Sequence, residues 1–322
     1  MYPFKNILYP TDFSPHARAA LKYAAAFARA SGGHVVLLSV QSGTVPANLL
    51  TLPDRVFEEQ SDKHWLKQLR ADVRDVLDDE LLAGVEVDPV IKEGEPAAEI
   101  TSAVRDYEID LITVVTHGRK GLAHMLWGST AEEIIAAAPC PVLTLRPPQR
   151  DFVEHRGPHT EIRLNRILLA TNFRPSALAA TNAAAELAGH TGAELHAIYV
   201  IGDYMEHMAA IFPDSAGPSV ARLREHVEER MAVFAREARG HINTHIAEGR
   251  PYEEILKLAT ERDVDLIVMG TSVHAPLFGG SPGLGPDMER VIRNSPCPVL
   301  CVPTGKVVTP APVLVAEPVP QT

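Results

Sequence analysis

The chain contains nearly the same sequence twice. Residues 5–15 read KNILYPTDFSP and residues 165–175 read NRILLATNFRP. Later, residues 138–143 read APCPVL and residues 295–300 read SPCPVL. Ile7 matches Ile167 and Cys140 matches Cys297, so the copies are offset by 160 residues near the start and by 157 near the end. A repeat of this length is a whole domain, which makes the chain a tandem duplication rather than a solenoid of short repeats.

Length and charge narrow the class of protein further. A chain of 322 residues suits two domains of ordinary size. The formal net charge of −11 argues against nucleic acid and anionic membranes as partners, because both are bound through basic faces. No apolar run approaches the roughly 20 residues of a membrane helix, and no signal-peptide pattern follows Met1. We therefore expect a cytoplasmic protein with no membrane segment, whose three cysteines are reduced and buried.

Both copies alternate short β-branched runs with helical patterns, which is typical of a parallel sheet wrapped by helices. The sequence predicts an α/β fold made of two tandem copies of a five-stranded parallel-sheet, Rossmann-like domain. Ser14 is expected to cap the first helix, with Pro15 at its first position. Further helices are expected at residues 54–82, 96–107, 131–138, 175 onward, 220–238, 252–260 and 288–293. Strands are expected at residues 7–9, 35–40, 85–91, 111–115 and 142–145, and again at 167–169, 195–200, 242–246, 266–269 and 299–302.

The domain boundaries follow from the repeat and from proline content. We place the first domain at residues 1–146 and the second at residues 163–303. Residues 147–162 between them are polar and punctuated by prolines, as in a linker. The tail at residues 304–322 is rich in proline and is expected to be extended and disordered.

Three segments of the first copy should meet at the carboxyl ends of its strands, where open parallel sheets bind ligands. The first is residues 10–12 (PTD), the second follows Val40, and the third is residues 116–130 (THGRKGLAHMLWGST). The Gly-Ser-Thr that ends the third segment offers close backbone approach, two hydroxyls and the free N–H groups of a helix start, all suited to an anion. The carboxylate of Asp12 suits a sugar hydroxyl or an exocyclic amine. Together these features predict a nucleotide site.

This pattern resembles the universal stress protein family, whose domain is the same five-stranded α/β fold. Nucleotide-binding members carry Gly, two residues, Gly, nine residues and then Gly-Ser or Gly-Thr. In the first copy Gly118, nine residues and Gly128-Ser129 match. Val115 stands where the family has its first glycine, and its side chain could crowd a triphosphate or lean away. The resemblance covers residues 3–146 and 163–303.

The resemblance implies that the first domain binds ATP or another adenine nucleotide, with Mg²⁺ as an optional companion. It also implies that the two domains pack as an intramolecular pseudo-dimer through their last strands, residues 142–145 and 299–302. A further homodimer of the whole chain is compatible with the resemblance. The residues implied to lie against the nucleoside are Pro10, Thr11, Asp12 and Val40. Those implied to surround the phosphates are His117, Gly118, Gly128, Ser129 and Thr130, with Val115 at the first glycine position.

The second copy departs from this pattern. Asn172 replaces the acid, and Gly270 restores the first glycine while Val273 replaces the second. Eleven residues, not nine, lead from there to Gly285. Pro286 then stands in place of the serine and has neither hydroxyl nor N–H, so the anion site loses two donors. The glycine-rich run before it could form another anion nest, although a loop is the simpler interpretation. We expect a degenerate, structural partner domain.

Several candidate residues also have simpler structural explanations. Asp12 could be a helix cap. His117 has no nucleophile or paired base beside it in the sequence, which favours a contact with phosphate or backbone over general-base chemistry. The histidine pairs at residues 155/159 and 241/245 have a spacing that binds metal on a helix, but they lie in the linker and in an expected strand. The glycine motifs of P-loop NTPases and dehydrogenases are missing from the sequence.

The sequence therefore predicts a stress-response sensor or regulator that binds an adenine nucleotide in its first domain and acts through an unidentified protein partner. We do not expect an enzyme, because no base, carboxylate pair for a metal or arginine finger stands out; slow ATP hydrolysis stays open. The alternative is a nucleotide-free scaffold that acts only through protein partners. Val115 and the altered second copy favour the scaffold, and the intact residues 118–130 oppose it.

Overall fold

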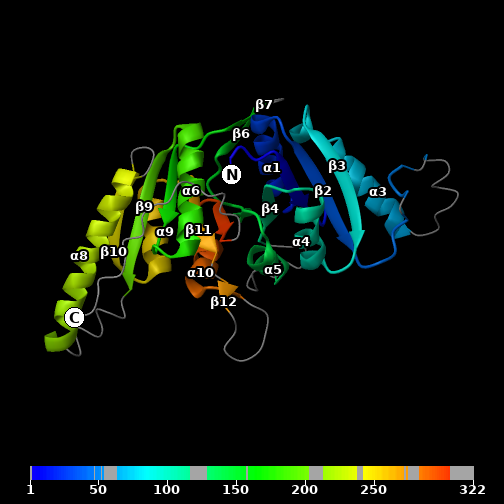
Figure 1. The fold of residues 1–322 in the computed structure, drawn as a ribbon. Helices are drawn as coiled ribbons and strands as arrows, with labels where there is room; N and C mark the ends of the chain where they lie inside the picture. The colour runs from blue at the N-terminus through cyan, green and yellow to red at the C-terminus, as the bar shows by residue number, and fades with distance from the viewer. Residues whose placement is uncertain are drawn as a thin grey trace.

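The computed structural model describes residues 2–46, 48–51, 53, 64–116, 129–156, 159–202, 213–237, 242–271, 273–274 and 283–304. These residues form one ten-stranded sheet with helices packed on both faces (Figure 1). The expected α/β fold, built from two similar halves, is confirmed. Among the described helices, none is long and apolar enough to cross a membrane.

The first half has the alternating order that its sequence predicts. The expected strands at residues 111–115 and 142–145 are found with the same bounds. The elements are β1 (Asn6–Pro10), α1 (Arg18–Ser31), β2 (His34–Gln41), α3 (His64–Leu77), the 3₁₀ turn η1 (Glu80–Leu82), β3 (Glu86–Glu93), α4 (Pro96–Asp106), β4 (Leu111–Val115), α5 (Ser129–Ala137) and β5 (Val142–Leu145).

The second half repeats this order, and a short strand pair is described before its last helix. The elements are β8 (Arg166–Ala170), α6 (Pro175–Thr191), β9 (Glu194–Gly202), α8 (Pro213–Glu237), β10 (Ile242–Gly249), α9 (Pro251–Glu261), β11 (Leu266–Thr271), β12 (Val273–His274), β13 (Gly283–Leu284), α10 (Pro286–Asn294) and β14 (Val299–Pro303).

The strand order places a candidate site in each half. The sheet runs β10-β9-β8-β11-β14-β5-β4-β1-β2-β3. In each half the chain starts in the middle strand, moves outward in one direction and then crosses to the other side. The switch points therefore lie between β1 and β4 and between β8 and β11. Ligands of open α/β sheets bind beyond the strand ends at such points.

The two halves join through their last strands. β5 and β14 pair antiparallel, with Leu143 opposite Leu300, while every other pairing in the sheet is parallel. The hydroxyl of Thr144 donates a hydrogen bond across the junction to the carbonyl of Val299, at 3.0 Å. The intramolecular pseudo-dimer is confirmed, and neither of these apolar strands is left as an edge.

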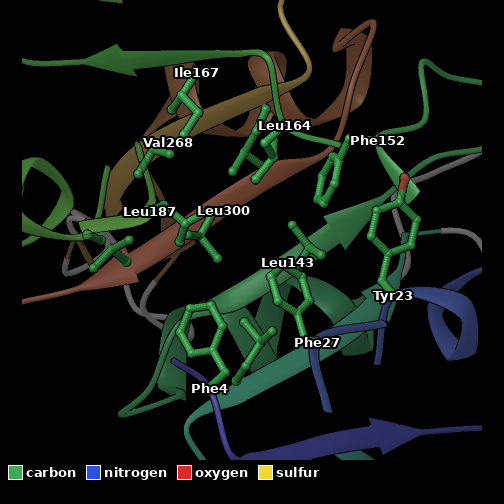
Figure 2. Close-up of a cluster of buried hydrophobic side chains, with 14 of the residues drawn as sticks. Phe4, Tyr23, Phe27, Leu143, Phe152, Leu164, Ile167, Leu187, Val268 and Leu300 are labelled. Carbon is green, nitrogen blue, oxygen red and sulfur yellow. The ribbon is translucent and has the colours of Figure 1, made fainter. Parts of the chain in front are cut away.

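Hydrophobic clusters on the two faces of the sheet each include residues of both halves. Figure 2 shows part of one cluster, with Leu143 and Leu300 from the junction strands near the rings of Phe4, Phe27 and Phe152. All five side chains are nearly or fully buried. Because burial of apolar surface is the main stabilising contribution to folding, the halves share one source of stability.

The connection between the halves is more ordered than a linker. Residues 153–162 contain an antiparallel hairpin of β6 (Val153–Arg156) and β7 (His159–Ile162) that packs on α1. Just before it, buried Phe152 meets Tyr23 edge to face with ring centroids 4.9 Å apart. Asp151 accepts a hydrogen bond from the Tyr23 hydroxyl at 2.8 Å and pairs with Lys22. The expected polar linker is thus, in part, a docked structural element.

Several expected helices differ in their bounds. α8 begins at Pro213, well before the expected residue 220. α1 begins at Arg18 rather than at residue 15. Residues 15–17 form a turn before it, in which the Ser14 hydroxyl accepts the backbone N–H of Ala17 at 3.3 Å. α1 ends as expected at Gly32, whose φ of 62° is left-handed. The helix expected at residues 54–82 is described only from residue 64, as α3 and the η1 turn. The expected disordered tail, from residue 305 onward, lies outside the described residues.

Candidate functional site

A cleft of about 250 Å³ lies at the switch point of the first half. It brings together segments from β1, β2, β4 and α5 that are far apart in the sequence. Six of the residues predicted from the sequence line it: Pro10, Thr11, Asp12, Val40, Val115 and Thr130. The other described residues that line it are Ser14, Ala17, Leu38, Pro96, Ile100, Val114, Thr116, Ala131 and Ile134.

The turn after β1 forms one rim of this cleft. The Thr11 hydroxyl accepts the backbone N–H of Phe13 at 2.9 Å, and the Asp12 carboxylate accepts that of Ser14 at 2.9 Å. These bonds hold Phe13 at a left-handed φ of 59°, which is unusual for a bulky residue. Burial raises the pKa of Tyr9 to about 12, so its hydroxyl stays protonated and donates to Thr11 at 3.2 Å.

Asp12 therefore has a structural role in addition to its position in the cleft. It stabilises the turn through Ser14 and does not cap α1, whose N-cap residue is Ala17. The alternative that Asp12 is only a helix cap is therefore wrong, because its bond stabilises the turn before the helix. Its side chain is exposed and lines the cleft, so the carboxylate can also face a ligand.

The walls of the cleft are apolar. Leu38 and Val40 come from β2, Ile100 comes from α4 and Ile134 comes from α5. Of these four residues, only Val40 was predicted from the sequence. In sequence the others have the spacing of ordinary core residues, and Leu38, Ile100 and Ile134 are indeed buried in the core. Their second role as the wall of a cleft appears only when the helices are placed against the sheet.

The start of α5 forms the opposite rim. The helix begins at Ser129, and half-buried Thr130 in its first turn lines the cleft. The first N–H groups of a helix have no partner within it, and together with the helix dipole they favour an anion. The predicted residues His117, Gly118 and Gly128 lie outside the described residues.

Val115 lies between the cleft and the core. It ends β4, it is half-buried, and its side chain packs against the same hydrophobic cluster as Leu145 of the neighbouring strand. It also lines the cleft. The next residue, Thr116, is held by a backbone bond of 3.0 Å to the carbonyl of Leu145. Val115 thus contributes to packing as well as to the shape of the site.

The second half has a smaller cleft of about 160 Å³ at the equivalent switch point. Gly270 and Asn172 line it, as the repeat predicts. At the start of α10, Pro286 occupies the first helical position, and the carboxylate-bearing Asp287 follows it into the cleft lining. Pro286 was expected from the sequence, whereas Asp287, which the repeat aligns with Thr130, was not among the predicted residues.

One member of the histidine pairs, His241, lies outside the residues that the structure describes. Among the described residues, no group of three potential His, Cys, Asp or Glu ligands comes together. His245 lies on β10 as expected and stacks on His196 of β9, with Nδ1 of His196 3.0 Å from Nε2 of His245. His155 and His159 are on the opposed strands β6 and β7.

Comparisons with known proteins agree with this architecture. A universal stress protein of Methanocaldococcus jannaschii is 29% identical over 163 residues, which are 44% of this chain and 95% of that protein. A crystal structure of a universal stress protein from Archaeoglobus fulgidus covers 93% of this chain and 98% of its own, at 24% identity and a TM-score of 0.59. A functionally unknown protein from Pseudomonas aeruginosa PAO1 covers 94% and 93%, at 18% identity and a TM-score of 0.63. The model of the universal stress protein family matches residues 3–146 and again residues 163–303, so this chain belongs to that family and carries its domain twice.

Proposed function

We propose that this protein binds an adenine nucleotide, with ATP as the expected ligand, in the cleft of its first half. It would act in the cytoplasm as a stress-response sensor or regulator, through binding rather than turnover. One observation carries the proposal. The turn at residues 10–12, Val40 of β2 and Thr130 of α5 converge on one cleft of about 250 Å³ at the switch point of the sheet.

The lining of the cleft suits the parts of a nucleotide. The apolar wall formed by Leu38, Val40 and Ile100 can take the flat face of a base. The carboxylate of Asp12 can accept hydrogen bonds from ribose hydroxyls or from an exocyclic amine. The first turn of α5, with Thr130, offers N–H groups and a hydroxyl to phosphate oxygens. Each part of the ligand therefore has a matching chemical group in the cleft.

The same lining supports binding more than catalysis. Among the described residues that line the cleft, Asp12 is the single acidic side chain, and there is no histidine or arginine. A Mg²⁺ ion would accordingly be held mostly by phosphate oxygens and water, as is common for this ion. Fast phosphoryl transfer needs positioned positive charges around the reacting phosphate, and the described lining supplies none besides that of the helix start.

The position of α5 suggests how binding could alter a surface of the protein. This helix lines the cleft and also contacts β13 of the second half, which directly precedes α10. Leu284 of β13 is buried in a cluster that also contains Ile134 and Ile135 of α5. A ligand that stabilises one position of α5 would therefore favour one arrangement of the junction between the halves. A protein partner that recognises this junction would then sense the nucleotide.

The second candidate function is a nucleotide-free scaffold. The observation that favours it is the second half, whose cleft has lost the hydroxyls and N–H at the helix start and has gained the carboxylate of Asp287. If the first cleft is likewise without a nucleotide, the ten-stranded unit would act only as a surface for partners.

Tryptophan fluorescence of the full chain separates these two functions. Both tryptophans, Trp65 and Trp127, are in the first half, and Trp127 directly precedes Gly128 in the sequence. Trp65 packs near Gly43, in the loop that follows β2. We expect saturable fluorescence changes with ATP, and calorimetry should give one strong ATP site per chain.

Reciprocal variants provide the control. Asp12→Asn copies the second half and should weaken ATP binding, whereas Asn172→Asp copies the first half in the second cleft and should leave the fluorescence titration unchanged. No response to ATP up to about 1 mM, which corresponds to about −4 kcal/mol, would instead support the scaffold.

A further inference from the structure

The cleft of the second half keeps the shape of a ligand site. It lies between the carboxyl ends of β8 and β11, and its walls include Ile198, Val200, Ile255 and Met269. Ile198 and Val200 occupy the places that Leu38 and Val40 have in the first half. The apolar wall has therefore been retained, although the start of the last helix has changed.

The turn at the rim of this cleft has also been retained. The Thr171 hydroxyl accepts the backbone N–H of Phe173 at 3.3 Å, and the Asn172 side-chain oxygen accepts that of Arg174 at 3.1 Å. Phe173 has a left-handed φ of 57°, close to the 59° of Phe13. Because the oxygen of Asn172 holds the turn, its amide NH₂ is the group that can donate to a ligand in the cleft.

The helix start on the other rim carries a negative side-chain charge in place of a neutral hydroxyl. α10 begins with Pro286, which has no N–H, and its N-cap Gly285 offers no side chain. The half-buried carboxylate of Asp287 lines the cleft in the first turn of the helix. A carboxylate in this position already neutralises the helix dipole, and it repels a phosphate.

We infer that the second cleft is a binding site for a nucleoside without phosphates, with Asp287 as the residue that excludes nucleotides. The Asp287 carboxylate accepts hydrogen bonds from ribose hydroxyls, the Asn172 amide donates to the ligand, and the apolar wall takes the base. The choice of a nucleoside, rather than another hydroxylated apolar molecule, rests on the function proposed for the first half. The first half would then bind the phosphorylated form of one kind of ligand, and the second half would bind its unphosphorylated form.

Methionine methyl NMR of the full chain tests this inference at the second cleft alone. Met269 lines that cleft, whereas no methionine lines the described part of the first cleft. With all seven methionines ¹³C-labelled at the methyl group, Met269→Leu identifies the Met269 signal. The probes are adenosine, AMP and ATP. We expect adenosine to shift the Met269 signal to saturation, and AMP and ATP to do so at concentrations at least about tenfold higher.

Two variants isolate the charge of Asp287. Asp287→Asn keeps its shape and should reduce the gap between adenosine and AMP to less than about threefold. Glu261→Gln removes one negative charge from the exposed end of α9, outside the cleft lining, and should leave the gap unchanged. A gap that persists in Asp287→Asn would overturn the role of Asp287. Equal shifts by ATP and adenosine in the wild type, or no shift with adenosine up to about 5 mM, would overturn the site.

Failure of this inference is distinguishable from failure of the proposed function. Tryptophan fluorescence reports on the first half, because no tryptophan lies beyond Trp127. If ATP changes the fluorescence and adenosine does not shift the Met269 signal, the proposed function is supported and the nucleoside site in the second cleft is contradicted.

Discussion

The clefts of the two halves occupy the same point of the same topology and differ most at one rim. Both have the turn in which Thr11 or Thr171 holds a phenylalanine in a left-handed conformation. At the facing helix, the first half presents Thr130, and the second presents Asp287 behind a proline. The cleft volumes are about 250 and 160 Å³, so both clefts could hold a small ligand, whereas only the second has a carboxylate at the helix start. Divergence has thus kept the framework of the site and changed its electrostatics.

The largest expected effect comes from copying the second rim into the first. Thr130→Asp places a carboxylate where we expect phosphate. It should weaken ATP binding by about 2–4 kcal/mol, from Coulomb repulsion at close range in a partly shielded site. Thr130→Asn introduces a side chain of nearly the same shape as aspartate but without its charge, and it serves as the control. Calorimetry with both variants decides the matter, and equal affinities would show that phosphate does not approach α5.

Removing the acid of the first turn should have the next largest effect. Asp12→Ala should weaken nucleotide binding by about 1.5–3 kcal/mol, because a hydrogen bond to a charged group is lost. The turn also loses its bond to Ser14, so the circular dichroism spectrum and the melting temperature must be compared with the wild type. Asn172→Ala makes the matching change in the second half. Equal losses of ATP affinity in both variants would contradict an ATP site confined to the first cleft.

Exchanging Val115 and Gly270 compares the two strand ends. Val115→Gly should lower the free energy of unfolding by about 2 kcal/mol, since partly buried methyl groups are lost and a flexible glycine enters a strand. Tighter ATP binding on the folded variant would show that the valine crowds the phosphates. Gly270→Val should narrow the second cleft and leave ATP binding unchanged. Urea unfolding and calorimetry on the same samples give both quantities.

The stacked histidines His196 and His245 of the second half should make the stability of the protein depend on pH. Burial lowers the pKa of both His196 and His245, and Arg262 lowers them further, while Glu194 acts in the opposite direction. As the pH falls below about 6.5, the unfolded chain takes up protons before the folded one, so stability is lost on acidification. The loss is at most about 1.4 kcal/mol per pH unit for each imidazole.

The first half provides the control for this prediction. Strand register places Val36 and Val90 where the second half has His196 and His245. The double variant His196→Val with His245→Val should therefore remove most of the loss between about pH 7.5 and 5.5, as measured by urea unfolding. An unchanged pH dependence would locate the sensitive groups elsewhere.

Much of the fold could be predicted because its signals are local. The apolar runs at residues 111–115 and 142–145 became strands with those bounds, and the repeat required a second copy of whatever the first copy formed. The start of α1 was misplaced, because Ser14 and Pro15 have the features of a helix cap, while the Ser14 hydroxyl in fact closes a separate turn. The hairpin in the linker was missed, because its two buried apolar anchors, Phe152 and Val153, lie within a polar stretch.

The candidate site was only partly predictable for a related reason. Residues next to strand ends, such as Thr11 and Asp12, could be assigned from position, because a parallel sheet brings these ends together. Ile100 and Ile134 could not, since a helix residue that lines a cleft has the same pattern as one that lines the core. Asp287 could not be predicted from the motif, because the motif specifies the donors of a phosphate site and gives no expectation for a new carboxylate at the helix start.

The junction between β5 and β14 has a further consequence for how such a protein can change. If the two units were separate identical chains, any substitution at one site would appear at both, and assembly would depend on concentration. In one chain the partner is tethered, so its effective concentration is independent of how much protein the cell makes. Each unit can then acquire its own substitutions while the shared sheet holds the pair together. A tethered pair of this kind can divide two recognition tasks between halves that still fold as one body.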